Sequence, residues 1–136
     1  MANATNYLEK KLLDHVLGKT SFTMPTVAYL AVLTADPTET GSLTSEIAPT
    51  GYARQAITTA MSATGATDGT STNESTITFG PAGADWGSGD AITYAGVMDA
   101  STGGNMLIYM PLDTPQIINN GGNLQFPIGE LTLSVA

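Results

Sequence analysis

Apolar side chains recur along residues 5–17 at a spacing that places them on one face of a helix. These apolar positions are Leu8, Leu12, Leu13, Val16 and Leu17. Thr5 or Asn6 is suited to cap the first turn, and Gly18 can adopt the left-handed conformation that ends a helix. Because a helix of this length is marginal alone in water, we expect its apolar stripe to be buried against the domain or against another subunit.

Beyond the helix, the pattern changes to short apolar or alternating runs, which are typical of β-strands. Strands are predicted at residues 26–34, 52–57, 75–79, 92–98, 106–112, 124–128 and 131–135, with a weakly patterned stretch at 58–75. The first run is apolar at nearly every position and fits a strand buried on both faces. Turns rich in Gly and Asn at 101–105 and 119–123 predict two hairpins, the second pairing residues 117–118 with 124–128.

Roughly seven or eight strands, with a turn about every 8–12 residues, indicate an antiparallel β-sandwich. The predicted fold is therefore mainly β, with one short N-terminal amphipathic helix. A length of 136 residues agrees with one domain. Within it we distinguish an N-terminal helical arm, residues 1–18, and a β-sandwich, residues 19–136.

Charge is distributed unevenly along the chain and limits the classes of partner. The formal net charge is -8, and the four basic residues all lie within the first 54 positions. Residues 55–136 contain seven acidic residues and no Lys or Arg. Nucleic acid and anionic membranes require a basic surface, so we expect neither as a partner. We expect the near-neutral N-terminal part to dock on a partner and the acidic remainder to face solvent.

Few residues suited to catalysis or metal binding are present. There is no Cys, and His15 is the only His, so a zinc site is excluded, and we expect no catalytic residue, metal or cofactor. A position of His15 on the helix surface or against a partner fits better than a role as a general base. Asp85 and Asp90 flank Trp86 and could hold a sugar ring. A lone Trp in a β-sandwich is more often a core or interface residue.

Arg54 is the only arginine of the chain. Arginine is favoured in buried ion pairs and at interface hot spots. We therefore expect Arg54 to pair with an acidic residue, either within the fold or across a subunit boundary. The candidate interface residues are Leu8, Leu12, His15, Arg54 and Trp86.

Several ordered blocks of the sequence resemble those of a family of small tailed-bacteriophage virion proteins. The blocks read NYLEKKLLDHVLG at 6–18, YLAVLTADP at 29–37 and GYARQA at 51–56. The agreement with the family continues, in the same order along the chain, at Phe79, Trp86, residues 95–97 and the Gly-Gly-Asn turn at 103–105. Members are often labelled tail fibre proteins, and similar small β-rich proteins decorate capsids. The resemblance spans nearly the whole chain, implies a structural component of the phage particle and carries over no catalytic residue.

Three hypotheses of function follow. The first is a non-enzymatic capsid decoration (cement) protein, a homotrimer that binds the major capsid protein and stabilises the head shell. The alternative is a tail-associated fibre or adaptor protein that contacts the host surface. The third is a carbohydrate-binding module built on Trp86 with Asp85 and Asp90. For the first two, we expect assembly in the host cytoplasm and a final location in the virion.

Overall fold

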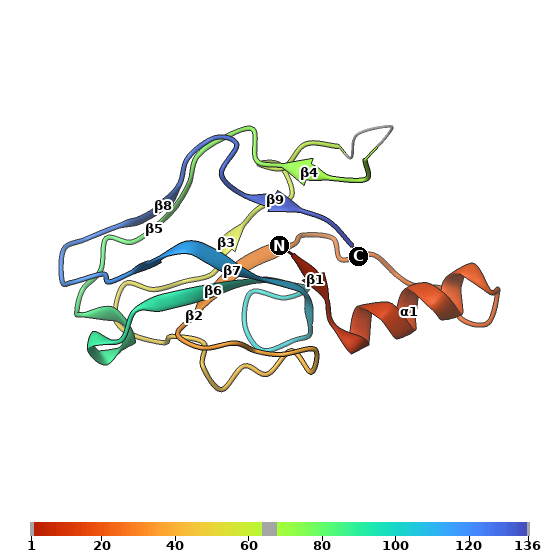
Figure 1. Ribbon diagram of the computed structural model, residues 1–136, viewed down its shortest axis with the longest axis horizontal. Coiled ribbons are helices and arrows are strands. Elements are labelled where there is room, and N and C mark those ends of the chain that lie inside the picture. The colour runs from red at the N-terminus through yellow and green to blue at the C-terminus, as the bar shows by residue number, and fades with distance from the viewer. Residues whose placement is uncertain (1, 64–67, 136) are drawn as a thin grey trace.

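The chain folds into antiparallel β-structure from which one helix projects (Figure 1). The structure, a computed structural model, describes residues 2–63 and 68–135. Its elements are β1 (Asn3–Ala4), α1 (Asn6–Val16), β2 (Tyr29–Leu33), β3 (Gln55–Ala56), β4 (Ser71–Thr72), β5 (Ile77–Phe79), a 3₁₀-helix (Trp86–Gly89), β6 (Ile92–Met98), β7 (Met106–Gln116), β8 (Leu124–Phe126) and β9 (Thr132–Leu133). The predicted mainly-β fold with an N-terminal α-helix is confirmed.

Five strands form the central sheet, in the order β1-β7-β6-β2-β3, and every neighbouring pair is antiparallel. β2 was predicted to be buried on both faces, and this is confirmed. Leu30 and Val32 enter the main core, while Ala31 and Leu33 pack on the opposite face of the sheet. The predicted hairpin around the turn at 101–105 is also confirmed, because β6 pairs with β7.

Two short ribbons of paired strands, β5–β8 and β4–β9, form a second layer. The main core lies between these ribbons and the central sheet. From the ribbons and the residues beside them it receives Ile77, Phe79, Leu124, Phe126, Leu131 and Leu133. The architecture is therefore a sandwich-like pair of layers whose second layer is divided into two ribbons.

The second predicted hairpin is wrong. A turn does form at 119–122, but β8 pairs with β5, with Phe126 opposite Ile77, and not with residues 117–118. Ile118 is instead buried in the main core. The alternation of apolar residues shows which side of a strand is buried, but it does not identify the neighbouring strand.

A buried asparagine joins the two ribbons. Asn73 is 1% exposed, and its Nδ2 donates hydrogen bonds to the carbonyl oxygens of Ser75, Phe126 and Pro127 at 2.9, 3.1 and 2.9 Å. Its Oδ1 accepts a hydrogen bond from the backbone N–H of Leu131 at 2.9 Å. Because these partners flank β8 and β9, one side chain fixes the spacing between the ribbons.

Several elements differ in extent from the prediction, and β7 continues to Gln116. The start of the chain, assigned to the helical arm, contributes β1 to the central sheet, where Asn3 pairs with Tyr109 and Ala4 with Ile108. The strand predicted at 52–57 is shortened to β3. Because β1 pairs with β7 and leads directly into α1, the N-terminal end of the helix is held to the central sheet.

Candidate interaction surface

Thr5 fixes both the start and the position of α1. Its Oγ1 accepts a hydrogen bond from the backbone N–H of Leu8 at 3.3 Å and donates one to the carbonyl of Met106 at 2.7 Å. Of the two predicted capping residues, Thr5 is therefore the one used. Because Met106 opens β7, the same hydroxyl caps the helix and attaches it to the central sheet. Gly18 has a φ of 70°, as predicted for the residue that ends the helix.

The apolar stripe of α1 is divided into a covered and an uncovered part. Leu8 is buried against β1 and β7, and Leu12 is half-buried beside it. Leu13, Val16 and Leu17 are 59%, 77% and 60% exposed; we call these three residues the arm patch. In Figure 1 the end of α1 that carries them extends away from the central sheet. The chain therefore buries the first part of the stripe and leaves the second part in solvent.

His15 holds the segment after α1 against the helix. Its Nδ1 accepts a hydrogen bond from the backbone N–H of Phe22 at 3.0 Å, and Phe22 packs in the same cluster as Leu8. With Nδ1 as the acceptor, the neutral imidazole carries its hydrogen on Nε2. His15 is exposed, which confirms its predicted place on the helix surface. A contact between His15 and a partner stays a prediction.

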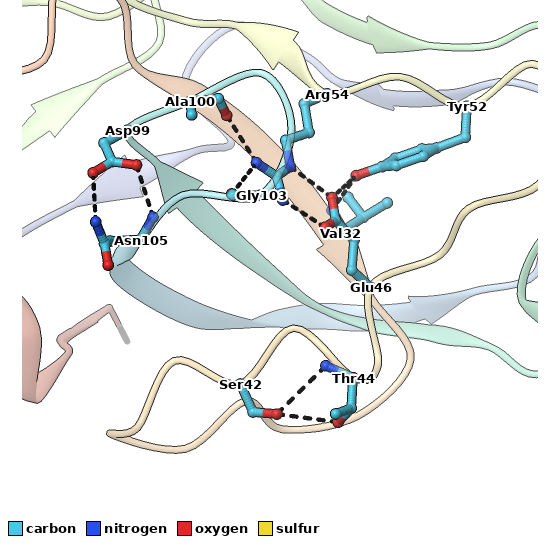
Figure 2. A network of polar contacts seen from close by, with 10 residues as sticks. All are labelled: Val32, Ser42, Thr44, Glu46, Tyr52, Arg54, Asp99, Ala100, Gly103 and Asn105. Atoms are coloured by element: carbon cyan, nitrogen blue, oxygen red, sulfur yellow. Dashed lines mark hydrogen bonds and ion pairs between the residues drawn. The ribbon is translucent and has the colours of Figure 1, made fainter.

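Arg54 lies at the centre of a network of polar contacts within the chain (Figure 2). Its Nε and Nη2 donate to Oε2 and Oε1 of Glu46 at 2.7 and 2.6 Å, which is a bidentate ion pair. Its Nη1 donates to the carbonyls of Ala100 and Gly103, both at 2.8 Å. Because those carbonyls belong to the turn between β6 and β7, Arg54 joins the loop that carries Glu46 to that hairpin.

Tyr52 completes the network on the side of the core. Its hydroxyl donates to Oε2 of Glu46 at 2.8 Å and accepts from the backbone N–H of Val32 at 3.3 Å. Burial, together with the hydrogen bond to Glu46, raises the pKa of Tyr52 far above its ordinary value. The hydrogen bonds to Glu46 likewise raise the pKa of Arg54. The side chains of Arg54 and Glu46 are only 4% and 14% exposed, so the pairing within the fold, one of the two predicted alternatives, is the one observed.

With this geometry in place, comparison with known proteins identifies the family. The family model described as "Podophage GP4 fiber I protein gp80" matches residues 3–134, a range that runs from β1 to the residues after β9. The chain belongs to this phage fibre family. The resemblance to virion structural proteins labelled as tail fibres is thereby confirmed. A search of curated proteins found no match.

Trp86 of this fibre-family protein is a core residue. It is 0% exposed, its Nε1 donates to the carbonyl of Thr50 at 3.2 Å, and its ring lies 5.8 Å from that of Tyr52, nearly perpendicular to it. Asp85 uses Oδ1 to accept a hydrogen bond from the backbone N–H of Asn120 at 2.9 Å. The core position, one of the two that the sequence favoured for Trp86, is therefore observed, and the alternative sugar site at Trp86 is wrong, because a fully buried indole cannot stack on a sugar.

The candidate interface residues separate into two groups. Leu8 and Trp86 are buried, and the guanidinium of Arg54 is used within the fold. Leu12 and His15 remain partly or fully accessible on α1. The accessible apolar surface of α1 in this fibre-family protein is therefore the arm patch, which follows Leu12 on the helix, and not the candidate residue Leu8.

Glu46, Tyr52 and Asn73 of the fibre-family protein have structural roles that were not predicted from the sequence. Tyr52 and Arg54 are two positions apart in an expected strand, which places them on the same side, and this spacing was a usable signal for their shared partner Glu46. Asn73 lies in the weakly patterned stretch at 58–75, where no periodicity marks it. Its importance arises from carbonyl groups more than 50 positions away in the chain.

Among residues 2–63 and 68–135, no group of three or more His, Cys, Asp or Glu side chains is placed to hold a metal ion. None of the helices described there is both long enough and apolar enough to cross a membrane.

Proposed function

We propose that this fibre-family protein is a non-enzymatic structural subunit of the phage fibre that contacts other virion subunits through the arm patch. The observation that carries the proposal is the exposure of Leu13, Val16 and Leu17 on a helix that is otherwise fixed to the sheet. A surface helix of a monomer normally turns its apolar stripe toward its own core. An uncovered stripe at the free end of a helix is the kind of surface that another protein covers.

The family description supports a fibre over a capsid decoration protein, the role that we first expected from the sequence. The description names a fibre protein of a podophage and does not mention the head shell. The two roles differ in copy number, since a shell offers many equivalent sites and a fibre few. We therefore propose a fibre subunit and treat decoration of the capsid as the competing outcome of the test.

Quantitative mass spectrometry of purified particles, calibrated against the major capsid protein, tests this proposal. A fibre subunit is expected in a few to a few dozen copies per particle. Hundreds of copies would contradict the fibre assignment and support decoration of the capsid. Antibody labelling in electron micrographs gives the location independently, at the tail region for a fibre or over the whole head for a decoration protein.

The role of the arm patch is tested by complementation. Phage that lack this gene are produced in cells expressing either the unaltered chain or the double variant Leu13→Ser/Val16→Ser. We expect the double variant to fold but to be absent from purified particles. The matched control is Ile117→Ser, because Ile117 is 61% exposed and lies outside the arm patch. Normal incorporation of the double variant would show that α1 is not the attachment surface.

A further inference from the structure

A groove with an apolar floor lies between the second half of β7 and the segment that carries β8 and β9. It consists of two adjoining hollows of about 250 and 510 Å³, which share Met110, Pro111, Asp113 and Glu130 as lining residues. Buried side chains of Met110, Leu124, Phe126 and Leu131 form its floor. Such a depression is of a size to receive a few apolar side chains of a partner.

The rim of this groove is acidic and has no basic counterpart. Asp113 and Glu130 are exposed and line both hollows. Among the described residues, neither takes part in an ion pair. Since residues 55–136 contain no Lys or Arg, this part of the chain cannot neutralise them. The groove therefore favours a partner that combines apolar side chains with positive charge.

The end of α1 has this combination. The arm patch supplies three exposed apolar side chains, and Lys10 and Lys19 are exposed on and just after the same helix. Lys10 is 74% exposed and contacts Asp14 on its own helix, a surface pair that a competing carboxylate can readily replace. Residues 6–19 also contain Lys11, Glu9 and Asp14, so their net charge is +1, opposite in sign to the charge of the rim.

A chain cannot place its own α1 in its own groove. Thr5, β1 and Leu8 fix the start of the helix to β7. Figure 1 shows the free end of α1 at one extreme of the long axis of the molecule, whereas β7, β8 and β9, beside which the groove lies, occupy the middle and the opposite part. Contacts made by these two surfaces must therefore form between different copies.

We propose that α1 of one copy docks in the β7–β8 groove of a second copy, with the arm patch over the apolar floor and Lys10 and Lys19 near Asp113 and Glu130. This contact joins two different surfaces, so it is heterologous and repeats head to tail, either closing into a ring or extending as a filament. The inference rests on the proposed role of the arm patch and adds the identity of its occupant, a second copy of this chain.

Sedimentation of the purified full-length chain over a range of concentrations gives the first test. The unaltered chain should form oligomers as its concentration rises. The arm variant Leu13→Ser/Val16→Ser and the groove variant Asp113→Lys/Glu130→Lys should each remain monomeric. The controls Ile117→Ser and Glu74→Lys alter exposed residues outside both surfaces and should behave like the unaltered chain. A monomeric unaltered chain, or a groove variant that still associates, would overturn the proposal.

Mixing the two monomeric variants distinguishes a head-to-tail contact from a symmetric contact between two helices. The arm variant keeps an intact groove, and the groove variant keeps an intact arm patch. Their mixture should therefore give a one-to-one dimer that cannot grow further. If two α1 helices packed against each other instead, the groove variant would still form dimers by itself and the mixture would give no mixed dimer.

Disulfide trapping keeps the test decisive if a variant folds poorly. Because the chain has no Cys, single substitutions Val16→Cys and Glu130→Cys report on one contact. Oxidation of their mixture with diamide should link the two variants, whereas Val16→Cys mixed with Ile117→Cys should not link. Absence of the first product overturns the head-to-tail contact. The proposed function would survive that result if the arm variant were still missing from particles, so the two failures are distinguishable.

Discussion

Around Arg54 the chain satisfies its polar groups by itself, whereas at the end of α1 it leaves three apolar side chains in solvent. The guanidinium of Arg54 donates four hydrogen bonds to Glu46, Ala100 and Gly103 (Figure 2). The arm patch has no comparable cover among the residues that the structure describes. For both regions the sequence left open a contact within the chain or with a partner, and only the arm patch remains available to a partner.

This difference separates residues that stabilise the fold from residues that serve assembly. A buried ion pair whose members already hold each other gains nothing from a second subunit, and breaking it leaves a charge unpaired. An exposed apolar patch contributes little to the free energy of unfolding of the isolated chain but favours association. Substitutions around Arg54 should therefore lower the free energy of unfolding. Substitutions in the arm patch should leave it nearly unchanged and weaken assembly.

The largest effect is expected for Arg54→Ala. It leaves the carboxylate of Glu46 without its ion-pair partner and frees the carbonyls of Ala100 and Gly103, so we expect a loss of about 3 kcal/mol in the free energy of unfolding. Urea denaturation measures the loss. The double variant Glu46→Leu/Arg54→Met removes both charges and should lose less than Arg54→Ala. A double variant as unstable as the single one would show that the unpaired charge is not the cause.

Asn73 is a second buried polar side chain whose hydrogen-bond partners lie within the chain. Its substitution tests whether such side chains stabilise the fold at positions other than Arg54. Asn73→Ala removes four hydrogen bonds, among them the one to the buried carbonyl of Phe126 and the one that the buried N–H of Leu131 donates, so we expect a loss of about 2 kcal/mol. Urea denaturation provides the measurement. Asn120→Ala, at an exposed position whose side chain holds no comparable network, is the control. Similar small losses for both variants would contradict the role of Asn73 in joining the ribbons.

The pH dependence of stability reports on Tyr52. Its pKa is raised in the folded chain, whereas the unfolded chain titrates near 10.0, so above that pH the unfolded state loses a proton that the folded state keeps. The free energy of unfolding should be independent of this group below pH 10 and fall above it. Tyr52→Phe should lower stability by about 1 kcal/mol near neutral pH and reduce the alkaline slope. Tyr94 and Tyr109, whose pKa values are also raised, should leave a residual slope.

The smallest effect on stability is expected at the arm patch. Leu13→Ala should change the free energy of unfolding by less than about 0.5 kcal/mol, because Leu13 is exposed. Leu8→Ala, at a buried position of the same helix, is the matched comparison and should cost about 2 kcal/mol. Thermal or chemical denaturation measures the free energy of unfolding of both variants. Equal losses would mean that the arm patch is covered in the isolated chain.

Features defined by neighbouring residues were predictable from the sequence. The helix follows from the spacing of Leu8 and Leu12 and from the caps Thr5 and Gly18. The burial of β2 on both faces follows from its continuous apolar run, and the β6–β7 hairpin from its glycine-rich turn. These signals are local, because capping, periodicity and turn formation act over a few residues.

Features that depend on distant segments were not predictable in the same way. β8 pairs with β5, which lies far earlier in the chain, and not with the residues just before its own turn. Trp86 was compatible with a core, an interface or a sugar site, and packing against Tyr52 places it in the core. An apolar side chain indicates that it will be covered, but the sequence does not identify the segment that covers it.

The sequence by itself thus determined a mainly-β chain with one amphipathic helix, an acidic surface beyond Arg54 and a likeness to phage virion proteins. Tertiary structure decided how the helical stripe is divided, with Leu8 against the sheet and the arm patch in solvent. It also decided that Arg54 finds Glu46 within the same chain. The physical reason is that hydrophobic periodicity shows which side of an element avoids water, while long-range packing determines how much of that side the chain itself can cover.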